Sequence, residues 1–294
     1  MKKIFELLII FGSVLCSSVQ LESSGFFSFS PHRKLGKLRI IGGEAVEPPN
    51  KYPFQAALYI YYGDLVALCG GSLINEKWVL TAAHCIEKNP SKVEVLLGAY
   101  NQSQDHENSR QIFLSQALFI HKDWDKRTLQ NDIGLIKLPD SASFNKNVGL
   151  IQVASGTSKY DGQTGTILGW GITESGRESD VLMQVNVRIM SNAECRHSDP
   201  AYSSVIKSSH LCTDGTDIKS SCSGDSGGPL IVGNTLVGLV SFGPSNCLLG
   251  YPSVFTRLTS FYPWINETMQ VNSSQHISAS IAIIGLWLVS LFLF

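Results

Sequence analysis

Short apolar runs of strand length recur along the chain between residues 40 and 240, and this pattern limits the fold more than any other feature. The runs are rich in β-branched residues; they are Val93–Leu97, Ile112–Ile120, Ile133–Leu138, Gly165–Leu168, Met183–Val187 and Leu236–Val240. Gly233 and Asn234, between two apolar runs, predict a tight hairpin. Helix signals are confined to a segment that begins near Ser191 and to Phe261–Met269. The pattern predicts an all-β sandwich or barrel.

The first residues have the features of an export signal. Lys2 and Lys3 precede the apolar run Ile4–Leu15, and small residues follow it. We therefore interpret residues 1–18 as a signal peptide. Residues 19–39 are rich in Ser and Phe, then basic, and contain no cysteine, so no disulfide can hold this segment to the rest of the chain.

Cysteine usage agrees with export. Cys16 lies within or beside the signal, which leaves six cysteines: Cys69, Cys85, Cys195, Cys212, Cys222 and Cys247. An even number in an exported chain indicates three disulfides rather than a catalytic thiol, although spacing alone leaves the pairing open. No C-x-x-C pair is present, which argues against a zinc site.

Charge excludes one class of partner. The formal net charge is −1, 16% of residues are charged, and no long run of one sign occurs. Nucleic-acid binding requires a concentrated basic face, so we expect none.

A serine lies among glycines in the string Gly224–Pro229. A serine hydroxyl is a poor nucleophile unless a base takes its proton and backbone N–H groups stabilise the oxyanion, and neighbouring glycines allow such an approach. The string also fits an ordinary Gly-rich turn or the nucleophile elbow of α/β-hydrolases. The elbow needs a following helix and a later histidine, whereas here Pro229 and an apolar strand follow and the only later histidine is His276.

Two further strings carry a histidine and an aspartate. His84 follows two alanines and precedes Cys85, and Asp132 precedes the apolar run Ile133–Leu138. Taken singly, each residue fits a structural role, since a histidine is usually a surface or core residue and an aspartate can cap a strand. A carboxylate at the mouth of a buried strand needs hydrogen-bond donors, and an imidazole N–H would be a suitable one.

Together these strings resemble the chymotrypsin/trypsin family of serine proteases. The resemblance covers residues 40–266 and rests on Ile40–Gly43, Ala82–Cys85, Asn131–Ile133, Gly169–Gly171, Gly224–Pro229, Ser241–Gly243 and Trp264–Ile265. It implies an all-β fold of two packed six-stranded antiparallel barrels with a short C-terminal helix. It also implies a secreted endopeptidase with Ser226 as nucleophile, His84 as general base and Asp132 as the residue that orients this base. A catalytically inactive binding homologue is the alternative from another class, but such proteins usually lack one of these three residues.

The resemblance assigns further roles. The N–H groups of Gly224 and Ser226 would form the oxyanion hole, and the segment Ser241–Gly243, with Phe242 where the family usually has Trp, would bind substrate as an added strand. The implied disulfides are Cys69–Cys85, Cys195–Cys212 and Cys222–Cys247. Cleavage after Arg39 would release an activation propeptide, residues 19–39, and the new ammonium of Ile40 would pair with Asp225.

The primary pocket is expected to contain Ser220, Gly243 and Ser253. Ser220 stands where trypsin-like relatives carry Asp, so burying a substrate cation would be costly and cleavage after Lys or Arg should be poor. Lys219 is expected to disfavour a cation further. Gly243 leaves the entrance open, while Ser253 narrows the slot. We expect cleavage after Phe, Tyr, Leu or Met, with an elastase-like preference for small residues as the alternative.

No cofactor or metal is expected. Calcium-binding relatives place carboxylates in the loop after Gly98, but this chain has Ala99 at the first ligand position and Ser109 near the last. The expected partners are protein or peptide substrates and an activating trypsin-like protease, and protein inhibitors remain open.

The tail, residues 267–294, combines a polar linker with an apolar run, residues 277–294. This run is at the short limit for a membrane span and has no following Lys or Arg. Small residues precede it, so we favour a glycosylphosphatidylinositol anchor at the cell surface over a transmembrane helix. Three N-x-[ST] sequons predict glycosylation sites: Asn101, Asn266 and Asn272.

Overall fold

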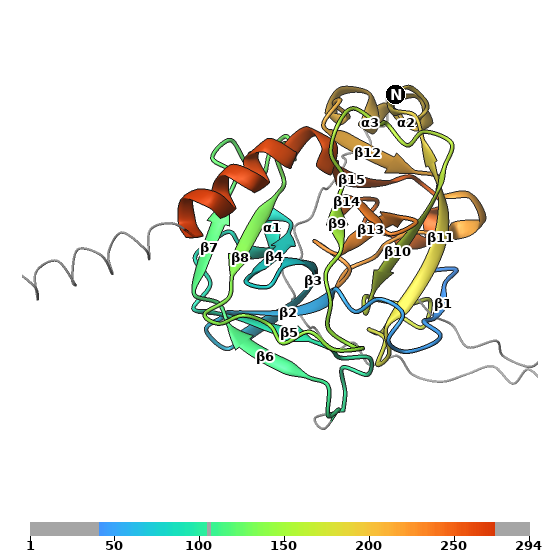
Figure 1. Cartoon of the computed structure of the whole chain (residues 1–294). Coiled ribbons are helices and arrows are strands. Elements are labelled where there is room, and N and C mark those ends of the chain that lie inside the picture. Colours follow the sequence, from blue (N-terminus) through green and yellow to red (C-terminus); the bar gives the residue numbers. More distant parts are fainter. Residues whose placement is uncertain (1–40, 105–106, 274–294) are drawn as a thin grey trace, which may run out of the picture.

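The computed structural model describes residues 41–104 and 107–273, and most of their regular structure is β-strand in two sheets (Figure 1). The predicted signal peptide, the activation segment with Arg39 and Ile40, and the apolar tail lie outside these residues.

The first sheet forms one barrel. In the described chain it has seven strands, in the order β6 (Gln111–Leu114), β5 (Lys92–Leu97), β2 (Gln55–Tyr62), β3 (Leu65–Asn75), β4 (Trp78–Thr81), β8 (Gly134–Lys137) and β7 (Ala117–Ile120). Every neighbouring pair is antiparallel.

The predicted strand Ile112–Ile120 is divided into β6 and β7, and this division closes the barrel. The Ser115 N–H donates to Val93 of β5, whereas the next N–H, that of Gln116, donates to Lys137 of β8. The strand therefore changes partners within two residues and joins the two ends of the sheet. β6 and β7 together serve as the sixth strand of the barrel.

The second sheet closes in a different way. Its path is β1 (Glu44–Ala45), β11 (Met183–Met190), β10 (Thr164–Gly169), β13 (Pro229–Val232), β14 (Thr235–Phe242), β15 (Ser253–Arg257) and β12 (His210–Thr213), and β9 (Gln152–Val153) pairs with β14. β12 also pairs with β11, so the six strands from β10 to β15 form a ring. The expected all-β fold of two six-stranded barrels with a short C-terminal helix is confirmed.

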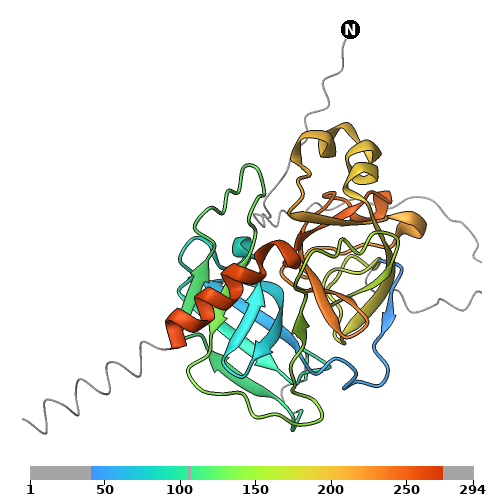
Figure 2. The same ribbon diagram turned by 45° about the horizontal axis from the view of Figure 1, so that its top comes forward.

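Local signals in this barrel act as predicted. Val232 pairs with Thr235, so Gly233, at φ +59°, and Asn234 form a two-residue hairpin. Ser191 caps helix α2 (Asn192–Ser198) in a capping box with Glu194. Helix α3 (Pro200–Val205) follows directly, and Figure 2 shows both helices standing beyond one end of the second barrel.

The interface between the barrels is apolar. One cluster of buried side chains joins Trp78 and Leu80 of the first barrel to Leu168 and Trp170 of the second. Burial of this surface holds the two barrels in contact. Three disulfides connect the pairs that the resemblance implies: Cys69–Cys85, Cys195–Cys212 and Cys222–Cys247.

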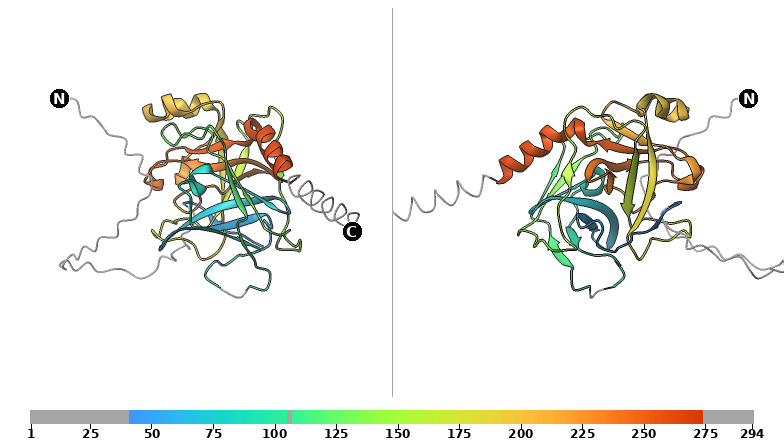
Figure 3. Two further views of the ribbon diagram at one scale, coloured as in Figure 1. Left: turned by 90° about the vertical axis from the view of Figure 1, so that its left-hand side faces the viewer. Right: turned by 45° about the vertical axis from the view of Figure 1, so that its right-hand side comes forward.

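The C-terminal helix spans residues 258–273, and it crosses from the second barrel onto the first (Figures 1 and 3). Its Phe261 and Trp264 rings contact His121 of the first barrel. The helix continues past Met269, where the sequence prediction ends it, because the Lys137 ammonium donates to the Asn272 carbonyl at 2.7 Å. The first residues of the predicted polar linker are therefore helical. None of the helices in the described part of the chain is long and apolar enough to cross a lipid bilayer.

Candidate active site

A buried carboxylate lies at the centre of the candidate site. Asp132, just before β8, is 1% exposed, and its carboxylate accepts three hydrogen bonds. Its Oδ1 accepts the backbone N–H of His84 at 2.9 Å, and its Oδ2 accepts the His84 Nδ1–H at 2.7 Å and the Ser241 hydroxyl at 2.6 Å. His84 belongs to the first barrel and Ser241 to the second, so donors from both barrels hold this carboxylate.

His84 is oriented as a base. It lies in the short helix α1 (Ala83–Ile86). Because its Nδ1–H donates a hydrogen bond to Asp132, the proton of the neutral imidazole is on Nδ1 and Nε2 keeps its lone pair. Burial lowers the pKa of His84, but the charge of Asp132 and the hydrogen bond to it outweigh this effect, so the pKa lies above its usual value.

The His84 ring lies close to two sulfur atoms, but this group is not a metal site. Within the described ranges, Cys69, His84 and Cys85 are the one cluster of potential ligands close enough to share an ion. The two sulfurs are joined in a disulfide, so neither is a thiolate that could bind a metal.

Ser226 lies in a loop that packs against the end of β4, the strand that precedes His84. The Gly70 N–H donates to the Ser226 carbonyl at 2.7 Å. Gly227 adopts a φ of +73°, and a Cβ there would overlap the hydroxyl of Thr81, the last residue of β4. Because Thr81 precedes His84 by three residues, this packing brings the serine loop and the histidine turn together.

Two backbone N–H groups in the serine loop have no protein acceptor among the described residues. Gly224 adopts a φ of +94°, and within the described chain neither its N–H nor that of Ser226 donates to a protein acceptor. These two N–H groups are the ones expected to bind an oxyanion, and donors without a protein partner suit that role.

Asp225 is a second buried carboxylate, and it is incompletely satisfied. Its two oxygens accept the N–H groups of Gly171 and Cys222, each at 2.9 Å. Burial nevertheless raises the pKa of Asp225 to about 7, despite these two hydrogen bonds. A Cβ at Gly171 would lie 2.6 Å from the carboxylate, and one at Gly169 would also overlap it, which explains the glycines in Gly169–Gly171.

No cation pairs with Asp225 among the described residues. Arg39 and Ile40, the residues expected to supply one by cleavage, lie outside them. Ile41, the first described residue, is 2% exposed and its carbonyl accepts the Ser220 N–H at 3.4 Å. The chain that follows Ile40 is thus already packed into the second barrel.

The three residues expected to form the primary pocket lie together. The buried Ser220 hydroxyl donates to the Cys247 carbonyl at 2.9 Å, and the Ser253 hydroxyl accepts the N–H of Ser221 at 3.3 Å. A Cβ added at Gly243 would be 3.9 Å from Ser253 and would meet nothing closer. A Cβ at Gly243 would therefore only just reach van der Waals contact with Ser253.

Lys219, which precedes Ser220 in the sequence, has contacts of its own in the structure. Its ammonium lies 3.9 Å from the Asp217 carboxylate. Its side chain packs beside Gly42, near the start of the described residues. Adjacency to Ser220 in sequence did not place the two side chains on the same side of the backbone.

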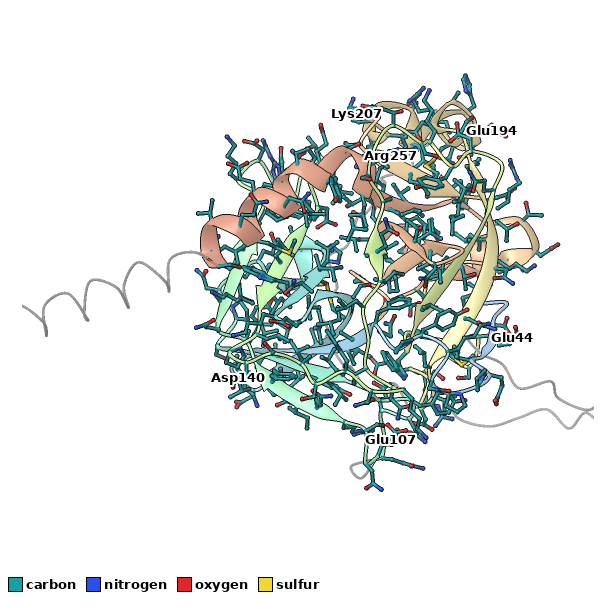
Figure 4. The ribbon with its side chains drawn as sticks, in the orientation of Figure 1. Glu44, Glu107, Asp140, Glu194, Lys207 and Arg257 are labelled. Atoms are coloured by element: carbon teal, nitrogen blue, oxygen red, sulfur yellow. A yellow bond between two sulfur atoms is a disulfide. The ribbon has the colours of Figure 1, made fainter. Side chains whose placement is uncertain are left out.

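The loop after Gly98 does not suit calcium. The Glu107 carboxylate (Figure 4) accepts the N–H groups of Tyr100 and Asn101 at 2.9 and 3.0 Å and pairs with Arg110 at 3.2 Å. Arg110 also donates to the Asn101 carbonyl. Because a guanidinium already contacts these oxygens, the donors in the described part of this loop, residues 99–104 and 107–110, do not fit a divalent cation.

The three sequons differ in local structure. The Asn101 side-chain oxygen accepts the N–H of Ser103 at 3.0 Å in a surface turn. Asn266 and Asn272 lie in the C-terminal helix, where the Asn272 amide donates to the Thr268 carbonyl at 2.7 Å.

Sequence reasoning missed two contacts to Asp132. It placed Ser241 only in the substrate strand, whereas the structure bonds its hydroxyl to Asp132. It did not identify Thr256, whose hydroxyl donates to the Asp132 carbonyl at 2.6 Å. No local signal marks Thr256, because nothing in its own segment predicts which distant residue it meets.

Comparisons with known proteins show which sequences and folds this chain is similar to. The family model for Trypsin matches residues 40–265. Brachyurin of Leptuca pugilator is 40% identical and covers 77% of this chain and 96% of its own, and a chymotrypsin of Phaedon cochleariae is 37% identical and covers 78% and 81%. The solved structure of HL collagenase superimposes with a TM-score of 0.72 at 33% identity and covers 79% of this chain and 99% of its own.

The interaction between Asp132 and His84 can be tested by titration. We expect NMR of the imidazole to give His84 a pKa above its usual value of about 6.5. In Asp132→Asn the pKa should fall below that value, because burial then acts without the opposing charge. A His84 pKa that does not change in Asp132→Asn would contradict the pairing.

Proposed function

Because the chain belongs to the trypsin family of serine proteases, we propose that it is a secreted serine endopeptidase, synthesised as a zymogen, that hydrolyses peptide bonds through an acyl-enzyme. The observation that carries this proposal is the Asp132–His84 pair, which leaves Nε2 as a base next to the serine loop. Residues 1–18 serve as the signal peptide and 40–266 as the protease domain.

Each of the three residues has one role. The Ser226 hydroxyl attacks the peptide carbonyl while His84 Nε2 takes its proton and passes it to the leaving amine. Asp132 holds the imidazole in the required tautomer and stabilises the imidazolium. The N–H groups of Gly224 and Ser226 bind the oxyanion, and water, activated by His84, then hydrolyses the acyl-enzyme.

Activation depends on Asp225. Cleavage after Arg39 would release residues 19–39 and give Ile40 a free ammonium, one residue before the buried Ile41. A buried carboxylate with a pKa of about 7 gains most from a cation, which would hold it ionised and fix the loop from Cys222 to Ser226.

Activation can be followed with a serine-directed phosphonate after trypsin treatment. We expect the phosphonate to label the wild type at Ser226 and not to label Ser226→Ala, and N-terminal sequencing should begin at Ile40. Asp225→Asn should be cut at the same bond but react at least about tenfold more slowly, since an amide cannot form the ion pair. Absence of labelling in the correctly cut wild type would favour an inactive binding homologue. A different N-terminus in the active protein would rule out this activation mechanism.

Specificity follows from the uncharged pocket. The proposed pocket residues Ser220 and Ser253 are buried and carry no carboxylate, so a substrate Lys or Arg bound there would lack a partner of opposite charge. We propose cleavage after Phe, Tyr, Leu or Met, in a slot that Ser253 shortens. An elastase-like preference for small residues is the alternative.

The pocket can be tested with peptides that differ only in the residue before the scissile bond. We expect kcat/KM for Phe and Leu to exceed that for Arg at least about tenfold, because an unpaired buried cation is costly. Ser253→Gly should raise kcat/KM most for the largest aromatic residues. Preference for Arg would refute the pocket assignment, and preference for Ala would support the elastase-like alternative.

The C-terminal tail is proposed to anchor the protein at the cell surface through glycosylphosphatidylinositol, with a transmembrane helix as the alternative. The described part of the C-terminal helix reaches residue 273 on the surface of the first barrel and includes Asn272 and Ser273, two of the small residues before the apolar run. Asn101, Asn266 and Asn272 are proposed glycosylation sites.

Treatment of expressing cells with phosphatidylinositol-specific phospholipase C distinguishes the two forms of attachment. We expect the protease to appear in the medium after treatment. A version whose tail is replaced by a known transmembrane helix is the control and should stay on the cells. Retention of the wild type as well would indicate a membrane span.

A further inference from the structure

Two buried polar side chains of the first barrel have no hydrogen-bond partner among the described residues. Gln55, the first residue of β2, is 2% exposed, and neither its amide nitrogen nor its amide oxygen is paired within that part of the chain. Ser72 of β3 is fully buried, and its hydroxyl likewise has no partner there. An unpaired buried polar group costs free energy, so a structural reason for both side chains is expected.

The two side chains lie next to each other. Gln55 is paired directly with Ser72 across β2 and β3, and directly opposite residues of antiparallel strands project from the same face of the sheet. Two amide atoms and one hydroxyl are therefore gathered at one place. Neither residue has a part in the proposed chemistry.

Gln55 lines a cavity of about 200 Å³. Apolar surface in its wall comes from Tyr52, before β2, and from Ala99 and Tyr100, after β5. A cavity of about 150 Å³ is large enough for benzene, so this one can hold a single ring with a polar substituent. Its described lining residues are all distinct from the proposed catalytic and pocket residues.

The wall of this cavity is fastened to the second barrel. The Tyr52 hydroxyl donates to the Gln184 side chain of β11 at 2.8 Å. The Tyr100 carbonyl accepts the Trp170 Nε1–H at 3.0 Å and the Leu182 N–H at 2.8 Å. Because two of its sides are held by hydrogen bonds between the barrels, the cavity is preformed, as small-molecule sites usually are.

Charge in the cavity favours a neutral ligand. Glu107, labelled in Figure 4, is the one charged side chain among the described residues that line it. Its carboxylate accepts the N–H groups of Tyr100 and Asn101 and pairs with Arg110, so its charge is already compensated. An anion would meet no basic side chain among the described lining residues.

The Gln55 amide restricts the ligand further. Its nitrogen donates and its oxygen accepts, so full pairing requires an acceptor and a donor side by side. A carboxylate only accepts and an ammonium only donates, and each would leave one amide atom of Gln55 unpaired. A carboxamide satisfies both atoms with two parallel hydrogen bonds.

We propose that this cavity is a binding site for a small neutral carboxamide with an apolar body. The amide of the ligand pairs with Gln55, and its apolar body contacts Tyr52, Ala99 and Tyr100. The site is separate from the proposed active site, so it does not depend on protease activity.

The test uses benzamide as the probe and the secreted protein with Ser226→Ala, which removes the proposed nucleophile and so prevents self-digestion. The NMR signal of the Ala99 backbone N–H reports on this cavity and separates it from binding in the primary pocket. We expect this signal to shift in a saturable way, with a Kd of about 1 mM or tighter.

Gln55→Met keeps a side chain of similar length but removes the amide. We expect it to raise the Kd for benzamide at least about tenfold, because the amide of the ligand would then be buried unpaired. The matched control is Gln116→Met, since Gln116 is an exposed glutamine of the same barrel outside the cavity. It should leave the Kd within about twofold of that of the parent protein.

Two related probes test the same pairing without a change at Gln55, so they decide the matter if Gln55→Met fails to fold. Benzoate has the same ring but no donor, and N,N-dimethylbenzamide keeps the carbonyl but has no N–H. We expect both to bind at least about tenfold more weakly than benzamide.

Three results would overturn the inference. The first is no saturable shift of the Ala99 signal up to about 10 mM benzamide, which would indicate that ordered water satisfies Gln55. The second is equal affinity for benzoate or N,N-dimethylbenzamide. The third is an unchanged Kd in Gln55→Met, which would show that the amide of Gln55 does not recognise the ligand.

Discussion

A carboxylate buried between two barrels needs donors, and the donors to Asp132 come from both barrels. His84 contributes its backbone N–H and its ring from the first barrel, and Ser241 contributes its hydroxyl from the second. Movement of one barrel against the other would leave a buried charge without partners, which costs several kcal/mol. The apolar interface around Trp170 holds the barrels in contact, but the buried charge of Asp132 requires one particular alignment of the two barrels.

Asp225 is also buried, but it has fewer hydrogen-bond donors than Asp132. It is as buried as Asp132, but within the described chain its oxygens have only two backbone donors, and its pKa is raised to about 7. Asp132 is therefore fully satisfied by the fold, whereas Asp225 would gain from a further cation. This difference gives a physical basis for the proposed activation by cleavage, which supplies an ammonium. An ion pair stabilises a buried carboxylate most where that carboxylate has the fewest hydrogen-bond donors.

Elements outside the site also link the two barrels. The helix described over residues 258–273 begins in the second barrel and packs Phe261 and Trp264 against His121, and Lys137 of the first barrel donates to its Asn272 carbonyl. The serine loop is fixed similarly, since Gly70 of the first barrel binds the Ser226 carbonyl. The proposed substrate site thus lies at a junction fastened by several independent contacts.

The sequence by itself determined part of the strands, the hairpin at Gly233, the cap at Ser191 and the motif residues His84, Asp132 and Ser226, because these depend on residues that are close in the chain. It did not identify β2, β3, β4, β12 or β15. Only the tertiary structure decided that the run Ile112–Ile120 divides, since strand partners are not encoded in apolar periodicity. It also decided how Asp132 is held: Ser241 and Thr256 lie 109 and 124 positions away. Hydrogen bonds over such separations form only after both barrels have folded, so no local pattern reveals them.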